Sequence, residues 1–177
     1  MAITESFVLP QRMYFVDLRT AETMEALFNP SELEESLEVL YNELGVPGLS
    51  HSPLQYSGTG NHKFGFELYA VGDGATQRAQ IEDFRRFLLS LCYPAAAADS
   101  VLTGAPPRVL FVWPELVSLQ ARILGVTFKH QRFALDGGTT RYVATLKVSE
   151  IRDARLTSED VRRLGTMRSG SAGESPV

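Results

Sequence analysis

The sequence is poor in the residues on which most catalytic and metal chemistry depends. It contains one cysteine, Cys92, and three histidines, His51, His62 and His130. No two of these histidines have the i, i+4 spacing of a helical zinc site, and Cys92 has no second cysteine beside it. Because Cys92 ends an apolar helical pattern, we expect a small core hydrophobe rather than a reactive thiolate. We expect no metal and no other cofactor.

Excess positive charge and long apolar runs are also missing. The 17 basic and 21 acidic residues give a net charge of -4, so we expect no direct binding of nucleic acid, which needs a basic face. No run approaches the roughly 18 apolar residues of a membrane-spanning helix. The N-terminal residues MAITESFVLPQR lack the basic and apolar regions of a secretory signal. We therefore expect no membrane insertion, and synthesis in the bacterial cytoplasm.

Patterns for phosphate binding and for hydrolysis are incomplete. The Gly58-Thr59-Gly60 segment comes before an expected strand and lacks the Lys-Ser/Thr ending of a phosphate-binding loop. An acidic stripe is the one basis for a hydrolase, and it comprises Glu32, Glu34, Glu35 and Glu38. These carboxylates are close in sequence and have no sugar-binding aromatic residue beside them, so a solvated or interface-facing stripe is the better interpretation. We expect a protein that is not an enzyme.

What is present suits an ordinary soluble domain. The 177 residues are 44% hydrophobic and 21% charged, close to the average for one globular domain of this length. Residues 12–164 are predicted to form this domain, after an N-terminal arm at residues 1–11. Residues 165–177 have almost nothing to bury and are predicted to be a flexible tail.

Alternating apolar residues predict a mainly β protein with antiparallel strands. The predicted strands are Met13–Leu18, Glu22–Phe28, Lys63–Val71, Arg108–Trp113, Leu119–Ala134 and Thr140–Ile151. The first two should form a hairpin, and the last two flank Asp136-Gly137-Gly138, which is a typical hairpin turn signal.

A single helix is predicted from Thr76 to Tyr93. Its apolar stripe consists of Ile81, Phe84, Leu88 and Leu91. Arg78, Arg85 and Arg86 lie off this stripe, where they indicate either a binding patch or, as we expect, a solvated face.

Two segments between the predicted strands Glu22–Phe28 and Lys63–Val71 are harder to interpret. Residues 32–44 fit helical spacing, with a capping box at Ser31 and Glu34, but they also fit the alternation of a strand. Local rules alone favour the helix. Gly45–His62 is rich in proline and glycine and is predicted to be a long loop. Because this loop keeps apolar side chains that solvent does not favour, we expect it to contact another subunit. The candidate interface residues are Val46, Leu49, Leu54 and Tyr56.

The order of several short motifs supports a family assignment. They are Phe28-Asn29-Pro30, Val46-Pro47-Gly48, Pro53-Leu54-Gln55-Tyr56, Gly58-Thr59-Gly60, Phe66-Glu67-Leu68-Tyr69, then a helix and the strand Arg108–Trp113. This order resembles the N-terminal domain of contractile injection system tube proteins, which form rings between the central spike and the inner tube of phage-tail-like particles. The resemblance covers roughly residues 12 to 155. Pro114 departs from it, since a glycine usually follows this strand in the family.

The resemblance implies an antiparallel β-barrel or sandwich with one helix, and a strand rather than a helix at residues 32–44. It also implies a ring of six copies whose partners are the inner tube protein, the trimeric spike protein and other baseplate proteins. The particle can be an extracellular device, an intracellular device or a virion. Many members continue into a LysM domain that binds peptidoglycan, and no room is left for one before Val177, so we expect no cell-wall binding.

The alternative function is a soluble β-barrel that binds a small ligand in its interior. Trp113, Phe111 and Tyr142 are the candidate pocket walls. A ligand carrier should be a monomer with a closed cavity, whereas a tube component should associate with its own kind.

Overall fold

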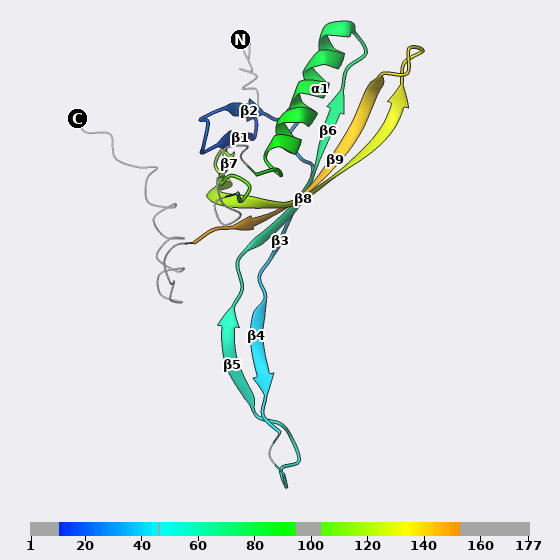
Figure 1. Cartoon of the computed structure of the whole chain (residues 1–177). Helices are drawn as coiled ribbons and strands as arrows, with labels where there is room; N and C mark the ends of the chain where they lie inside the picture. The colour runs from blue at the N-terminus through cyan, green and yellow to red at the C-terminus, as the bar shows by residue number, and fades with distance from the viewer. Residues whose placement is uncertain (1–10, 46, 95–103, 153–177) are drawn as a thin grey trace, which may run out of the picture.

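The computed structural model describes residues 11–45, 47–94 and 104–152. This part of the chain is mainly β, as predicted, and contains one helix (Figure 1). Its elements in chain order are β1 (Tyr14–Asp17), β2 (Thr23–Glu25), β3 (Leu33–Ser36), β4 (Val39–Glu43), β5 (Leu54–Thr59), β6 (Lys63–Val71), α1 (Ala75–Ser90), β7 (Val109–Trp113), β8 (Val117–Phe133) and β9 (Thr139–Glu150). The predicted tail at 165–177, and the predicted N-terminal arm apart from Gln11, lie outside the described residues.

Seven strands form one antiparallel sheet in the order β2-β1-β7-β8-β9-β6-β3. The two longest, β8 and β9, form the predicted hairpin, and Gly137 adopts a φ of 82° in the turn between them. The strand β7 ends at Trp113, and Glu115 follows the intervening proline with a φ of 66°. Among the described residues, no ladder joins β2 to β3 at the two ends of this order.

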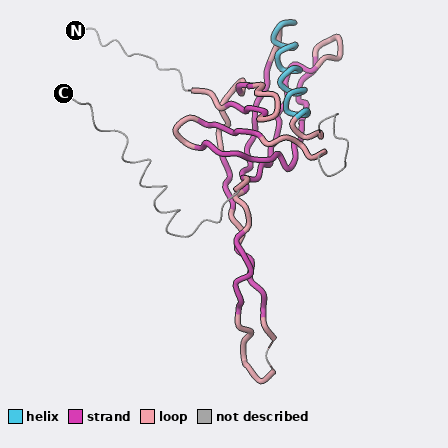
Figure 2. The backbone as a smooth tube through the Cα atoms, turned by 60° about the vertical axis from the view of Figure 1, so that its left-hand side comes forward, coloured by secondary structure: helices cyan, strands magenta, loops and turns pink. Residues whose placement is uncertain are grey.

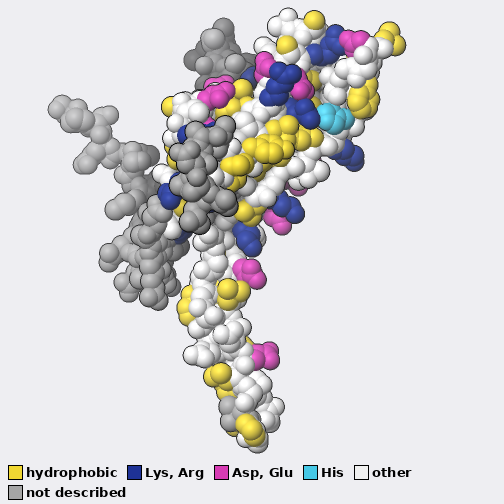
Figure 3. Space-filling view, in the orientation of Figure 1, with side chains coloured by type: hydrophobic (Ala, Val, Ile, Leu, Met, Phe, Trp, Pro, Cys, Tyr) yellow, Lys and Arg dark blue, Asp and Glu magenta, His cyan; other side chains and the backbone are white. Residues whose placement is uncertain are grey.

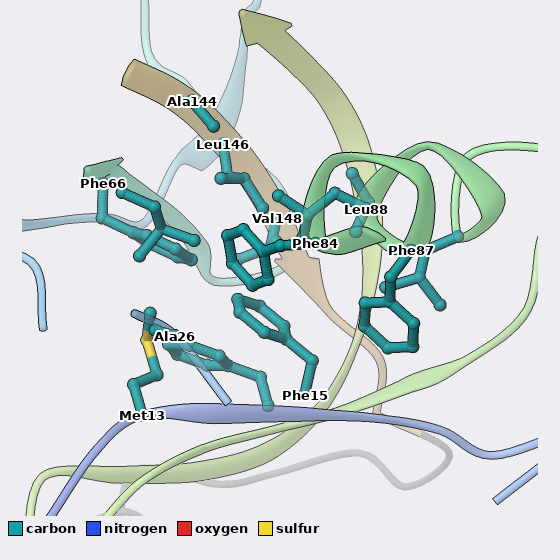
Figure 4. Close-up of a cluster of buried hydrophobic side chains, with 14 of the residues drawn as sticks. Met13, Phe15, Ala26, Phe66, Phe84, Phe87, Leu88, Ala144, Leu146 and Val148 are labelled. Atoms are coloured by element: carbon teal, nitrogen blue, oxygen red, sulfur yellow. The ribbon is translucent and has the colours of Figure 1, made fainter. Parts of the chain in front are cut away.

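The sheet curls strongly around its own core. Phe66 of β6 stacks on Phe111 of β7 with ring centroids 5.2 Å apart, although β8 and β9 separate these two strands in the sheet. In a flat sheet three strand spacings would place them about 14 Å apart. Phe15 of β1 lies 5.6 Å from the Phe111 ring. Figure 4 shows Phe15 and Phe66 gathered with Met13 and Ala26. The concave face of the sheet therefore holds the core.

Helix α1 covers the rest of this face. The predicted stripe is confirmed, since Ile81, Phe84, Leu88 and Leu91 are all buried, and Phe87 is buried beside them. The Tyr142 hydroxyl donates a hydrogen bond of 2.7 Å to the Ile81 carbonyl and ties the helix to β9. No helix in the described residues is long and apolar enough to cross a membrane.

Side chains at the edge of this helix behave as expected for a solvated face. Arg85 and Arg86 both pair with Glu82, at 3.1 and 3.4 Å, and the Arg85 guanidinium lies 5.5 Å from the centre of the Phe128 ring. Cys92 is partly buried against the core, and this burial raises the pKa of its thiol. A raised pKa suits the predicted small hydrophobe and opposes thiolate formation.

The structure corrects two expectations from local sequence rules. Residues 32–44 form β3 and β4, so the helix is wrong and the strand implied by the family resemblance is confirmed. The loop predicted at Gly45–His62 is too long, because Leu54–Thr59 is the strand β5. In both places the hydrogen-bonding partner decides the conformation: β3 pairs with β6, and β4 pairs with β5.

Candidate assembly interface

A two-stranded ribbon leaves the body of the protein, and none of the described helices and strands packs on it. We define it as residues 37–61, which contain β4 and β5 (Figures 1 and 2). It continues the hairpin of β3 and β6: β3 leads into β4, and β5 leads back into β6. One long hairpin thus has its base in the main sheet and its end well outside it.

Backbone pairing and two tyrosines keep the ribbon ordered. The register runs from Val39 opposite Thr59 to Glu43 opposite Leu54, with an irregularity between Leu40 and Tyr41. The Tyr41 and Tyr56 rings meet edge to face with centroids 5.9 Å apart, and the Tyr56 hydroxyl is 2.7 Å from the Thr59 hydroxyl. Cross-strand aromatic pairs of this kind stabilise antiparallel strands.

The base of the ribbon is held by charged side chains. His62 lies 3.2 Å from the Glu35 carboxylate and 3.8 Å from that of Glu150, while Lys63 lies 3.7 Å from Glu38. The Gly60 amide donates to the Glu38 carbonyl at 2.8 Å, and the Glu150 amide donates to the His62 carbonyl at 2.8 Å. The ladder therefore continues from the sheet into the base of the ribbon.

The ribbon exposes an unusual amount of apolar surface. Every residue of β4 is exposed, and so is every residue of β5 except Gly58. Its exposed large apolar side chains, each between 45% and 64% accessible, are Leu37, Val39, Leu40, Tyr41, Leu44, Leu49, Leu54 and Tyr56. Figure 3 shows yellow side chains spaced along it, down to its tip. Large apolar side chains gathered on one exposed element of a soluble protein indicate an interaction site.

Three of the four predicted interface residues lie on this ribbon. Leu49, Leu54 and Tyr56 are 51%, 64% and 54% accessible, and Val46 lies outside the described residues. Sequence reasoning missed Val39, Leu40, Tyr41 and Leu44 as candidates, because the helical interpretation of residues 32–44 assigned such residues to a buried stripe. The strand alternation of the same segment was a signal for Val39 and Tyr41, whereas Leu40 and Leu44 lie on the other face of the strand.

The residues proposed as walls of a ligand pocket do not form one. Phe111 and Tyr142 are each only 1% accessible and belong to the packed core, against which Trp113 is partly buried. A cavity of about 440 Å³ between α1 and the β8–β9 turn is lined by Tyr142 but not by the other two aromatics. Another, of about 360 Å³ on the outer face of β6 and β9, is lined by none of the three.

The acidic stripe is divided by strand geometry. Adjacent side chains of a strand point to opposite faces, so Glu34 and Glu35 of β3 diverge. Glu35 lies beside His62 and Glu38 beside Lys63, so these two carboxylates each have a basic side chain as their neighbour. Glu32 and Glu34 instead line the cavity of about 360 Å³. In the described part of the chain, no group of three or more histidine, cysteine or acidic side chains is arranged to hold a metal ion.

Comparison with known proteins agrees with the resemblance seen in the motifs. The family described as contractile injection system tube protein matches residues 15–159. Two solved structures are similar in outline. A chain of the phage P2 baseplate in its activated conformation with Ca is 10% identical, with a TM-score of 0.44 over 85% of this chain and 52% of that one. A chain of the anti-feeding prophage (AFP) baseplate is 14% identical, with a TM-score of 0.35 over 82% and 92%.

This chain spans about half the length of the matched phage P2 chain. Among curated proteins, none matches. The family match extends over β1 to β9 and includes the whole ribbon. The chain therefore belongs to the family of contractile injection system tube proteins and is a structural component of such a particle.

Proposed function

We propose that copies of this chain form a ring, of six subunits by analogy with the family, that joins the inner tube to the trimeric spike at the baseplate. The ring contacts the inner tube protein on one side and the spike and other baseplate proteins on the other. Assembly of the protein requires no cofactor and no chemical step.

The observation that carries this proposal is the exposed apolar ribbon. An isolated two-stranded hairpin is marginally stable in water, and each of its strands is a free edge that invites further pairing. Here the tip and both faces carry large apolar side chains that the protein's own body does not cover. Association with neighbouring subunits buries these side chains and supplies the missing contacts.

Assembly of two ribbon variants tests the role. Replacing Leu54 and Tyr56 together by serine removes two exposed side chains from β5 without touching the core. We expect the melting temperature of the isolated protein to stay nearly unchanged, because surface substitutions usually change stability by less than about 0.5 kcal/mol. We expect rings or particles, viewed by electron microscopy of the purified complex, to be absent.

The matched control is Leu124→Ser with Tyr93→Ser, which removes the same two residue types from the body. These side chains are 59% and 65% accessible, close to the 64% and 54% of the ribbon pair. Intact particles containing the ribbon variant, or an equal assembly defect in the control, contradict a specific role for the ribbon.

A further inference from the structure

Three cations on the distal half of the β8–β9 hairpin are left without counter-charges. Lys129 and Arg132 of β8 and Arg141 of β9 are all exposed. Within the described part of the chain, none of them forms an ion pair. By contrast, Arg78 on the neighbouring helix pairs with Asp136 at 2.5 Å. The three residues are called the distal cations below.

The sheet register brings these cations onto one surface. Arg132 lies directly opposite Arg141, and Lys129 lies opposite Val143. Along β9 the core-facing residues are Tyr142, Ala144, Leu146 and Val148, so Arg141 and Val143 lie on the opposite, outer face, where Arg141 is exposed and Val143 is only 5% accessible. Like charges directly opposite each other on paired strands are destabilising. A partner surface rich in hydrogen-bond acceptors, placed over this pair of arginines, would offset their repulsion.

The same outer face continues from the cations to a cavity at its other end. The cavity of about 360 Å³ is lined by the polar side chains of Tyr69, Thr145 and Lys147, by the carboxylates of Glu32, Glu34 and Glu67, and by Gly65, which has no side chain to fill it. From Lys147 to Arg141 is six residues along β9, or about 20 Å. The strand β5 also has six residues, so a ribbon laid along β9 spans the face from this cavity to the distal cations.

The ribbon has the complementary chemistry. Residues 37–61 contain Glu38 and Glu43 and no lysine or arginine, and Glu43 has no ion-pair partner among the described residues. Both strands of the ribbon are edge strands with unpaired backbone carbonyls. Arginine donates several N–H groups from one plane, so it can bind such carbonyls as well as a carboxylate.

The two surfaces cannot meet within one molecule. The ribbon extends from one end of the body, whereas the β8–β9 turn lies at the other end beside α1 (Figures 1 and 2). Complementary patches at opposite ends of a subunit are the arrangement of head-to-tail interfaces, which close into rings or continue as stacks. We propose, building on the assembly role above, that the ribbon of one copy docks on the outer face of β9 of the next copy, with Glu43 near the distal cations.

Charge reversal tests this contact. Arg141→Glu and Glu43→Arg should each weaken self-association roughly tenfold or more, measured by sedimentation velocity over a concentration series. The first lowers the summed charge of the distal cations from +3 to +1, and the second sets a cation against them. The control Arg86→Glu makes the same change of charge on an exposed arginine of α1 and should leave association unchanged. Circular dichroism melts confirm that each variant is folded.

Mixing the two charge-reversal variants tests the contact more directly than either variant alone. Each of the two variants alone loses charge attraction at every contact. In an equimolar mixture the Glu43→Arg ribbon meets the Arg141→Glu face at one kind of contact, and at the other the wild-type Glu43 meets the wild-type Arg141. Association should return in the mixture and in the double variant. Unchanged association of Arg141→Glu, or no rescue on mixing, overturns this docking while leaving the ribbon's assembly role intact. A wild-type protein that never associates overturns the assembly role itself.

A nucleic acid is the other partner that the distal cations could bind, and this is tested separately. Retarded migration of a DNA or RNA duplex by the wild-type protein, lost in Arg141→Glu while self-association persists, would assign the distal cations to nucleic acid and overturn the proposal. We expect no retardation at physiological salt.

Discussion

The body and the ribbon are made of the same secondary structure, yet different forces hold them. In the body, β6 alternates between buried residues and more accessible ones, and its inward Phe66 stacks on Phe111 in the core. In the ribbon, β4 has no buried residue at all. The body's strands are fixed by what lies on their inner face, while the ribbon's strands are fixed by each other and by the hairpin base.

Along this one hairpin, some strands therefore contribute to folding and others remain available for assembly. Side chains of β6 contribute to the free energy of unfolding, because water leaves them when the monomer folds. Side chains of β4 and β5 remain in water after folding, so their burial is still available for association. Substitutions in the two regions should therefore give opposite patterns of stability and assembly.

The largest loss of stability is expected for Phe84→Ala. Phe84 is 1% accessible and lies between α1 and the sheet (Figure 4), so its truncation leaves a cavity. We expect the free energy of unfolding to fall by about 3 to 5 kcal/mol, measured by denaturant titration. A fall similar to that of a ribbon substitution would show that the helix presents another face to the core.

A smaller loss is expected for Tyr142→Phe. This change removes the hydroxyl that donates to the Ile81 carbonyl and should cost about 1 kcal/mol at neutral pH. Burial, reinforced by the charge of Glu82, raises the pKa of Tyr142. A raised pKa means that the stability linked to the neutral phenol is present below the normal tyrosine pKa of about 10 and is lost as the pH rises further. The difference in melting temperature between the wild type and Tyr142→Phe should therefore shrink as the pH rises above about 10. A difference that stays constant with pH would contradict the burial of the hydroxyl.

Arg85→Ala should cost less than about 1 kcal/mol. The side chain pairs with Glu82 and lies over the Phe128 ring, and both contacts are partly solvated. Denaturant titration beside Phe84→Ala gives the comparison. If the two variants are equally destabilised, the arginine is part of the core.

Asp136→Asn should have a small and pH-dependent effect. The hydrogen bond from Arg78 lowers the pKa of Asp136, with the Gly138 amide as the next cause. Stability from a lowered pKa is present above the unfolded-state value and is lost as the pH falls through the folded-state value. The melting temperature of the variant should be slightly below that of the wild type at pH 7 and equal to it in strong acid. Equal melting temperatures at every pH would show that the ion pair contributes nothing.

The smallest effect on the monomer is expected from removing most of the ribbon. Residues 39–59 can be replaced by Asn-Gly, because the Gly60 amide already donates to the Glu38 carbonyl as in a two-residue hairpin turn. The free energy of unfolding should change by less than about 0.5 kcal/mol, while ring formation should be lost. A molten or insoluble body would show that the ribbon supports the sheet.

Sequence alone predicted those elements whose stabilisation is local or has one buried face. The spacing of Ile81, Phe84 and Leu88 predicted the helix, and the alternation of Tyr142, Ala144 and Leu146 predicted the inner face of β9. In each case the residues that face one shared core recur at a regular spacing along the sequence. The extra buried residue of the helix, Phe87, widens the stripe without changing its direction.

The ribbon was not predictable from local rules, since nothing within it distinguishes a strand from its alternatives. Leu33, Leu37, Leu40 and Leu44 fit a helix, and only pairing with β6 and β5 selects the strands. The strand Leu54–Thr59 contains Ser57 and Gly58, which usually indicate a turn. Leu49, Leu54 and Tyr56 were nonetheless proposed as interface residues, because large apolar side chains in a polar segment need a partner whatever the backbone does. Their exposure fits that proposal, and their contact with another subunit stays a prediction.

The unbroken hairpin also has a mechanical consequence. Tension along the ribbon passes through the backbone into β6, whose whole length from Lys63 to Val71 is bonded to β9. Because the pull is directed along these strands, it loads the hydrogen bonds of that ladder in shear, all at once, rather than peeling them apart one after another. The contacts of His62 with Glu35 and of Lys63 with Glu38 lie where the pull enters. The ribbon is thus anchored near one edge of the main sheet, through the full length of β6 and its ladder with β9.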